Sequence, residues 1–164
     1  IAMSPRCTNC HALSDTPLQL EGKNLRVHAM NIRRGFENLG GKCVSCHQNH
    51  NFTSEHMPPG AEDWRMPSLQ KGFGPATSVA ELCQLWKSRR NQFEHGPNIG
   101  QPRSALQLLE HVSKDPLVKW AFEPGPGRTP AFPAVVTANG RKASGHTYFI
   151  ENFRIWIEGG APCP

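Results

Sequence analysis

The sequence has little charge, no block of like charges and no long apolar run. Charged residues make up 19% of the 164 positions, below the usual quarter, so the chain does not belong to the charge-rich disordered class. A transmembrane helix is excluded because no run of about 18 apolar residues occurs. Glycine and proline are instead abundant, with 15 residues each. This excess predicts long loops, short helices and a thin apolar core whose middle is filled by something other than side chains.

A net charge of +5 is compatible with nucleic-acid binding, but the basic residues are scattered along the chain. The densest group is Lys87, Arg89 and Arg90, with only Trp86 and Phe93 as nearby rings for base stacking. This arrangement favours a solvated face, and we expect no nucleic-acid partner. The sequence begins at Ile1 with no signal-peptide pattern, so we expect a mature or trimmed form.

One cysteine pattern occurs twice. Residues 7–11 read CTNCH and residues 43–47 read CVSCH. C-x-x-C-H is the attachment signature of c-type haem. The chemistry needs this spacing because two thiols add to the two vinyl groups of the porphyrin, while the adjacent histidine reaches the iron. We therefore expect two covalently attached haem c groups, bound by Cys7, Cys10, Cys43 and Cys46, with His11 and His47 as axial ligands.

Other uses of C-x-x-C fit less well. The spacer between the two pairs is longer than in zinc ribbons, and a thioredoxin-like motif needs a βαβ setting that the pattern does not show. Haem c is attached outside the cytoplasmic membrane, so we expect an exported, periplasmic protein in a compartment where disulfides persist. Cys83 and Cys163 then remain as an even pair, for which we expect a disulfide. Two free thiols, or a ligand role for one of them, are the alternative.

The expected fold class is mainly α with extensive loops, with short helices packed around two covalent haems. Residues 1–75 form the expected dihaem-binding region, and residues 76–164 form a helical region that packs on it within one compact domain. Helices are predicted over residues 77–93, with Thr77 or Ser78 as the cap, over 103–114, with Ser104 as the cap, and over 146–158. Short helical turns are predicted over 6–12, 42–48 and 116–120. Residues 123–133 are too rich in Pro and Gly for a strand. The predicted apolar stripes contain Val79, Leu82, Cys83 and Trp86, then Leu106, Leu109 and Val112, then Phe149, Phe153 and Trp156.

The second axial ligand of each iron sets the redox potential, because Met raises it relative to His. His28 lies midway between the motifs and His56 follows the second one, so these two histidines are the first-ranked candidates. His111 is a remote candidate for this ligand, and a helix-surface residue that faces Glu110 is the preferred interpretation. The lower-ranked candidates are Met30, Met57, Met66 and His50.

The two motifs with His28 between them resemble the dihaem small subunit of periplasmic nitrate reductase, over residues 7–47. That resemblance implies an electron-transfer protein with His on both sides of each iron, although Met3 is here the only possible ligand upstream of Cys7. A longer resemblance is to small bacterial proteins described as a subunit of isoquinoline 1-oxidoreductase. It implies a link to a molybdenum hydroxylase that hands off electrons. The matching stretches are residues 28–31, 34–35, 43–48, 56–61, 111–112, 115–118, 124–128 and 160–164.

We therefore expect an electron carrier and not an enzyme: a periplasmic dihaem c-type cytochrome that passes single electrons between a dehydrogenase or other oxidoreductase and a respiratory acceptor. The expected partner is a redox protein, such as a molybdenum hydroxylase or another periplasmic dehydrogenase. The alternative is a dihaem peroxidase-like enzyme or a haem sensor with one open iron. Its acid–base groups would come from His95 or His111 with Glu94 or Glu110.

Overall fold

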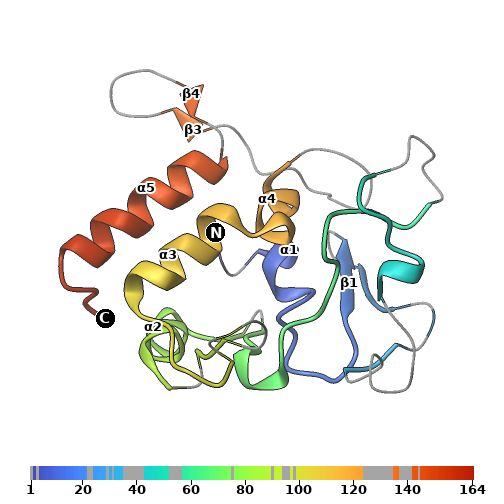
Figure 1. The fold of residues 1–164 in the computed structure, drawn as a ribbon, viewed down its shortest axis with the longest axis horizontal. Coiled ribbons are helices and arrows are strands. Elements are labelled where there is room, and N and C mark those ends of the chain that lie inside the picture. The colour runs from blue at the N-terminus through green and yellow to red at the C-terminus, as the bar shows by residue number, and fades with distance from the viewer. Residues whose placement is uncertain are drawn as a thin grey trace.

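The computed structural model shows a mainly helical chain with extensive loops (Figure 1). It describes residues 2, 4–21, 24–28, 30, 32–34, 43–51, 57–74, 76–89, 91–93, 97, 99–123, 135–136, 142–143 and 145–164. Within these residues there are five α-helices and two short hairpins. The mainly α prediction is therefore confirmed at this level. In the same residues, no helix is both long and apolar enough to span a bilayer.

Two helices begin with the same capping arrangement. Helix α2 (Val79–Lys87) has Ser78 and Glu81 in a capping box, and helix α3 (Ala105–Lys114) has Ser104 and Gln107 in the equivalent positions. Both caps agree with the sequence prediction. The predicted span 77–93 for the first of these helices was too long, because the chain leaves the helix at Ser88, whose side chain donates to the Leu85 carbonyl.

Helices α4 and α5 complete the helical half. Helix α4 (Pro116–Phe122) has Pro116 in its first turn, and the Asp115 side chain caps it by accepting from the Leu117 N–H. It is a full helix where the sequence predicted only a short turn. Helix α5 (Gly145–Glu158) matches its prediction and packs against α3 (Figure 1). Gly160, with φ of 84°, follows its end.

Two hairpins were not predicted. Strands β1 (Leu18–Glu21) and β2 (Asn24–Val27) pair antiparallel, as do β3 (Val135–Val136) and β4 (Lys142–Ala143). The first hairpin has a consequence for the site: it returns the chain so that the His28 N–H donates to the Pro17 carbonyl. His28 is thereby carried back beside the segment that follows the first C-x-x-C-H motif.

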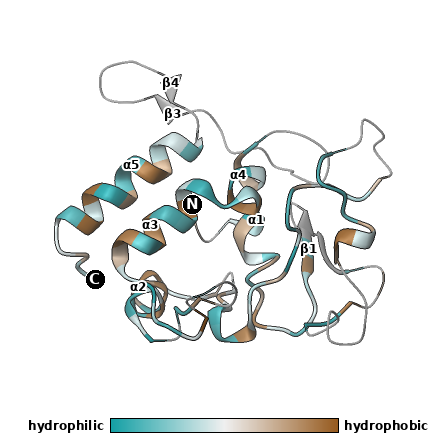
Figure 2. Ribbon diagram, in the orientation of Figure 1, coloured by the Kyte–Doolittle hydropathy of each residue, from teal (hydrophilic) through white to brown (hydrophobic). Residues whose placement is uncertain are grey.

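The core is thin, as the abundance of glycine and proline predicted, and Trp86 contacts both of its apolar clusters. Figure 2 shows apolar positions alternating with polar ones along the helices. The prediction for Leu106 was wrong, because it is 70% exposed while Leu108 is buried. At about 100° per residue, Leu106 lies about 200° from Leu108, so only one of them can face α5. Besides Trp86, one cluster contains Ala2, Cys7, Phe73, Leu82 and Leu85. The other contains Leu108, Leu109, Val112, Phe149, Phe153, Trp156 and Ile157.

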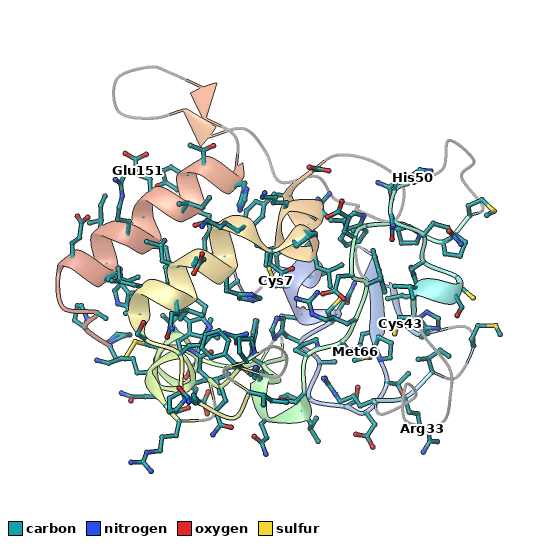
Figure 3. The ribbon with its side chains drawn as sticks, in the orientation of Figure 1. Cys7, Arg33, Cys43, His50, Met66 and Glu151 are labelled. Carbon is teal, nitrogen blue, oxygen red and sulfur yellow. A yellow bond between two sulfur atoms is a disulfide. The ribbon has the colours of Figure 1, made fainter. Side chains whose placement is uncertain are left out.

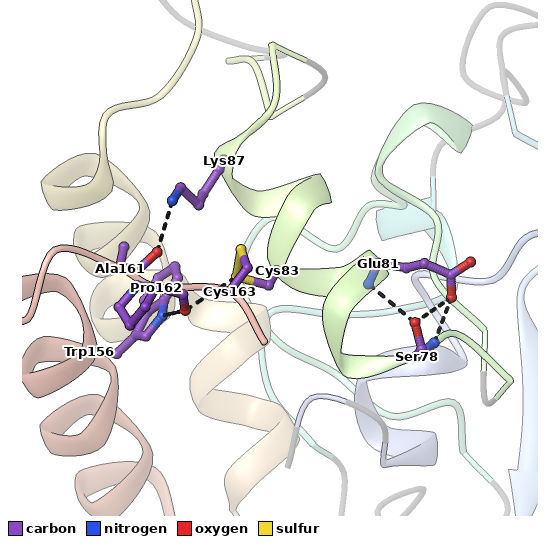
Figure 4. Close-up of a disulfide and its surroundings, with 8 residues drawn as sticks. All are labelled: Ser78, Glu81, Cys83, Lys87, Trp156, Ala161, Pro162 and Cys163. Atoms are coloured by element: carbon purple, nitrogen blue, oxygen red, sulfur yellow. Dashed lines mark hydrogen bonds between the residues drawn. A yellow bond between two sulfur atoms is a disulfide. The ribbon is translucent and has the colours of Figure 1, made fainter.

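The predicted pairing of Cys83 with Cys163 is present as a disulfide, with a Cα–Cα distance of 5.6 Å (Figure 4). The tail is held at two further points. The Trp156 indole N–H donates to the Pro162 carbonyl at 2.8 Å, and the Lys87 ammonium donates to the Ala161 carbonyl at 2.9 Å. The C-terminus is therefore tied to α2.

Candidate functional site

The two C-x-x-C-H segments are helical turns that share one backbone hydrogen bond. Helix α1 (Pro5–Thr8) carries Cys7, and the 3₁₀ turn η2 (Cys43–Ser45) carries Cys43. In each segment the histidine N–H donates to the carbonyl of the first cysteine, at 2.9 Å in both cases. The short helical turn predicted at each motif is therefore present, and its i to i+4 hydrogen bond brings the histidine back beside the first cysteine. The segments lie apart in the molecule, with Cys7 near its centre and Cys43 toward one side (Figure 3).

The two motif histidines use the same ring nitrogen in the same way. Nδ1 of His11 lies 2.9 Å from the Lys71 carbonyl oxygen, and Nδ1 of His47 lies 2.6 Å from that of Pro59. A carbonyl can only accept, so Nδ1 carries the proton in both rings. Nε2 then holds the lone pair that binds a metal, and a carbonyl on the other nitrogen is the usual support for a metal-binding histidine.

Each of these rings also stacks on an aromatic residue. The rings of His11 and Phe73 have centres 4.6 Å apart, and those of His47 and Trp64 are 4.1 Å apart and nearly parallel. Trp64 in turn packs edge-on against Trp120. Together with the hydrogen bond at Nδ1, the stacking fixes the orientation of each imidazole.

A glycine follows each carbonyl that accepts from a motif histidine. A Cβ atom at Gly60 would lie 2.0 Å from the His50 carbonyl oxygen, and one at Gly72 would lie 2.8 Å from that of Ala12. Real Cβ contacts are never this short with backbone atoms, so both positions need glycine for close approach of two chain segments. These contacts place the carbonyls of Pro59 and Lys71 where the rings can reach them.

The first motif opens onto a cavity of about 320 Å³, a size within the range of cofactor sites. Cys7, Cys10 and His11 all line it. Its walls are mainly apolar, with four cationic residues and two acidic ones among them. The apolar walls include Phe73, Leu85, Trp86, Leu108, Val112, Leu117, Val118, Trp120 and Phe149, and the charged residues are Arg6, Arg65, Lys71, Arg103, Asp63 and Asp115.

The thiols of the first motif are buried and protonated. Burial raises the pKa of Cys7 to about 12 and that of Cys10 to about 11.

The Arg34 guanidinium donates to the carbonyls of Ala12, Ser14 and Pro67. It therefore joins the chain after His11 to the segment that leads to Lys71.

At the second motif the structure brings a predicted ligand to its partner. The rings of His28 and His47 have centres 6.0 Å apart. Metal–imidazole bonds are about 2.0–2.1 Å long, so two rings on opposite sides of one ion have centres about 6 Å apart. Burial lowers the pKa of both histidines, which favours the neutral, metal-binding form. The Met30 N–H donates to Nδ1 of His28 at 3.3 Å, which places the proton of the neutral ring on Nε2. Binding of a metal through Nε2 would require that proton to move to Nδ1 and would end this hydrogen bond.

The other predicted ligands are less well placed. Met30 and Met57 are 70% and 44% exposed, and His50 is exposed as well. Met66 is half-buried and does not line the cavity of the first motif. His56 lies outside the described residues.

His111 differs from its sequence interpretation. It does not pair with Glu110, which instead forms an ion pair with Lys114. Nδ1 of His111 lies 3.2 Å from the Asp115 carboxylate, and His111 lines the cavity of the first motif. The contact between His111 and Asp115 could have been predicted from their spacing, because residues four apart on a helix are neighbours.

No family model, curated protein or solved structure matches this chain. Over the described parts of the chain, no three His, Cys, Asp or Glu side chains gather into a group that could hold a bare metal ion.

Proposed function

We propose that this protein is a dihaem c-type cytochrome that carries single electrons between a redox enzyme and an acceptor outside the cytoplasmic membrane. The observation that supports it best is the repetition at the two motifs. Both have the same turn, the same Nδ1–carbonyl hydrogen bond and an aromatic ring stacked on the histidine. Two independent segments with this geometry favour one shared chemistry.

The residues present fit the group at the first motif. Cys7 and Cys10 would hold it through thioether bonds and His11 through Nε2. The apolar walls exclude water, and the cationic side chains of Arg6, Arg65, Lys71 and Arg103 suit carboxylate substituents at its edge. A haem bound there supplies iron that alternates between ferric and ferrous states and so carries one electron at a time.

At the second motif Cys43, Cys46 and His47 would have the same roles, with His28 as the proposed second ligand. Trp64 connects the two sites, because its ring stacks on His47 and also lines the cavity of the first motif. This proximity suits a protein that passes electrons from one group to the other. The proposed partners are a periplasmic dehydrogenase, such as a molybdenum hydroxylase, and a respiratory acceptor.

The test is made on protein produced together with a haem c attachment system. Absorption spectra of the oxidised and reduced protein are recorded before and after adding carbon monoxide. We expect low-spin bands, reversible one-electron reduction at both sites and no rapid carbon monoxide binding. A high-spin component that binds carbon monoxide would overturn the carrier proposal in favour of a peroxidase-like enzyme or a gas sensor.

A further inference from the structure

A second histidine lines the cavity that holds Cys7, Cys10 and His11. His111 on α3 contributes to its wall, together with Leu108 and Val112 from the same helix. Its side chain is 27% exposed, so most of the ring is inside the protein. The cavity therefore has imidazoles contributed by two segments far apart in the sequence.

The ring of His111 is oriented by a carboxylate. Oδ2 of Asp115 lies 3.2 Å from Nδ1 of His111 and 2.5 Å from a guanidinium nitrogen of Arg65. The Asp115 side chain is only 8% exposed. The Leu117 N–H donates to Oδ1 of the same carboxylate at 2.9 Å. An ionised carboxylate accepts the Nδ1 proton, which places the lone pair of His111 on Nε2.

The other described histidines are engaged elsewhere. Nε2 of His146 lies 2.8 Å from the Val112 carbonyl oxygen, His50 is exposed, and His28 lies beside His47. Among the described residues, His111 is the histidine that combines a place in the first cavity with a carboxylate on Nδ1.

We propose that His111 is the second axial ligand of the haem attached to Cys7 and Cys10, and that Asp115 is the positioning residue that holds its ring. The proposal rests on the proposed function, since it requires haem at the first motif. The two proposed ligands of this haem differ in the group at Nδ1. Nδ1 of His111 faces the Asp115 carboxylate, whereas Nδ1 of His11 faces the neutral carbonyl of Lys71. A carboxylate on Nδ1 would make the imidazole of His111 a stronger donor, which would favour ferric iron and lower the potential of a haem bound there.

The experiment compares the haem-loaded protein with H111G, H111M and a matched control, H146Q, which removes an imidazole that does not line the cavity. Haem content is first counted by the pyridine haemochrome method, which tests the proposed function separately. Electron paramagnetic resonance then measures the low-spin and high-spin fractions, and a redox titration gives the two midpoint potentials.

In H111G we expect two haems per chain, with about half of the low-spin signal converted to high spin and restored by added imidazole. In H111M we expect one midpoint potential to rise and the other to stay, because Met raises the potential relative to His. H146Q should match the wild type. If H111G retains the full low-spin signal, or if H111M leaves both potentials unchanged, His111 is not the ligand. A high-spin haem in the wild type would also overturn the proposal.

The role of Asp115 is tested with D115N, because Asn can still accept from the Leu117 N–H and so keeps the cap of α4. We expect both haems to stay low spin while the potential of one rises. A purely structural role would lower the thermal midpoint and leave both potentials where they were, and that result would contradict the positioning role.

Discussion

The imidazole rings of His28 and His47 have their centres 6.0 Å apart, although one follows a β-hairpin and the other follows a 3₁₀ turn. The hairpin of β1 and β2 returns the chain past Pro17, and the C-x-x-C-H turn directs His47 toward the same place. The pair has the spacing that two ligands of a single ion require.

The first prediction concerns this pair. In the haem-loaded protein, H28A should convert about half of the low-spin signal to high spin, because one iron loses its second ligand. The change should appear in the electron paramagnetic resonance spectrum with two haems still attached. The control is M57L, which alters an exposed methionine near the second motif and should leave the spectrum unchanged. An unaltered spectrum in H28A would remove His28 from the site.

The second prediction concerns Gly60. A methyl group there would meet the His50 carbonyl oxygen at 2.0 Å, so G60A must displace the segment whose Pro59 carbonyl accepts from His47. We expect a lower thermal midpoint and reduced haem attachment at the second motif only. G74A is the matched control, since its nearest contact is the flexible Leu13 side chain at 3.2 Å. Equal behaviour of the two variants would show that the close approach at Gly60 has no role in the site.

The third prediction concerns the disulfide. It closes a loop with a sequence separation of 80, and the chain-entropy model assigns about 4–5 kcal/mol to a loop of that length. The C83S/C163S double variant should lose stability of this order in urea unfolding followed by far-ultraviolet circular dichroism. Its visible spectrum should not change, because neither sulfur is a proposed ligand. A loss below about 1 kcal/mol would mean that the hydrogen bonds of Trp156 and Lys87 hold the tail without it.

The fourth prediction is a pH dependence at the start of α2. Hydrogen bonds from the Ser78 N–H and hydroxyl hold the pKa of Glu81 below its usual value. A carboxyl with a depressed folded-state pKa stabilises the fold above its unfolded-state pKa, and loses that contribution as pH falls through the folded-state value. The difference in unfolding free energy between wild type and E81A should therefore shrink as the pH is lowered below about 4.

E81Q is the control for this effect. Gln is uncharged but can still reach back to the N-cap N–H, as Gln107 does at the start of α3. The difference between E81Q and E81A should therefore not vary with pH. If the wild-type difference is equally flat, ionisation of Glu81 does not contribute to stability.

Sequence reasoning predicted the helices and their caps from local signals, and the disulfide by elimination. Ser78 and Ser104 precede apolar stripes of helical period, and Cys83 and Cys163 are the cysteines left outside the motifs. It missed the hairpin of β1 and β2, whose strands are short and whose connection, Gly22-Lys23, is not an Asn-Gly or Asp-Gly pair. It also missed the hairpin of β3 and β4, although Asn139-Gly140 stands in the sequence between these two strands. It also placed Leu106 in the core, since an apolar pattern does not say which neighbouring helix lies where.

The candidate site was only half accessible to sequence reasoning. The C-x-x-C-H spacing named the cysteines and the two motif histidines, because attachment chemistry requires residues close in sequence. The residues around them come from distant segments. Phe73, Trp64 and the Lys71 carbonyl reach their histidines only through the tertiary fold. His111 was assigned to a helix surface for the same reason, since nothing local indicates that α3 borders the cavity of the first motif.

The most direct test of the central claim is the intact mass of the protein produced with a haem c attachment system. We predict the polypeptide mass plus two haems, with one haem lost in a variant carrying C7S and C10S and the other lost in a variant carrying C43S and C46S. A wild-type mass equal to the bare polypeptide, with four free thiols that react with an alkylating agent after unfolding, would contradict the dihaem interpretation.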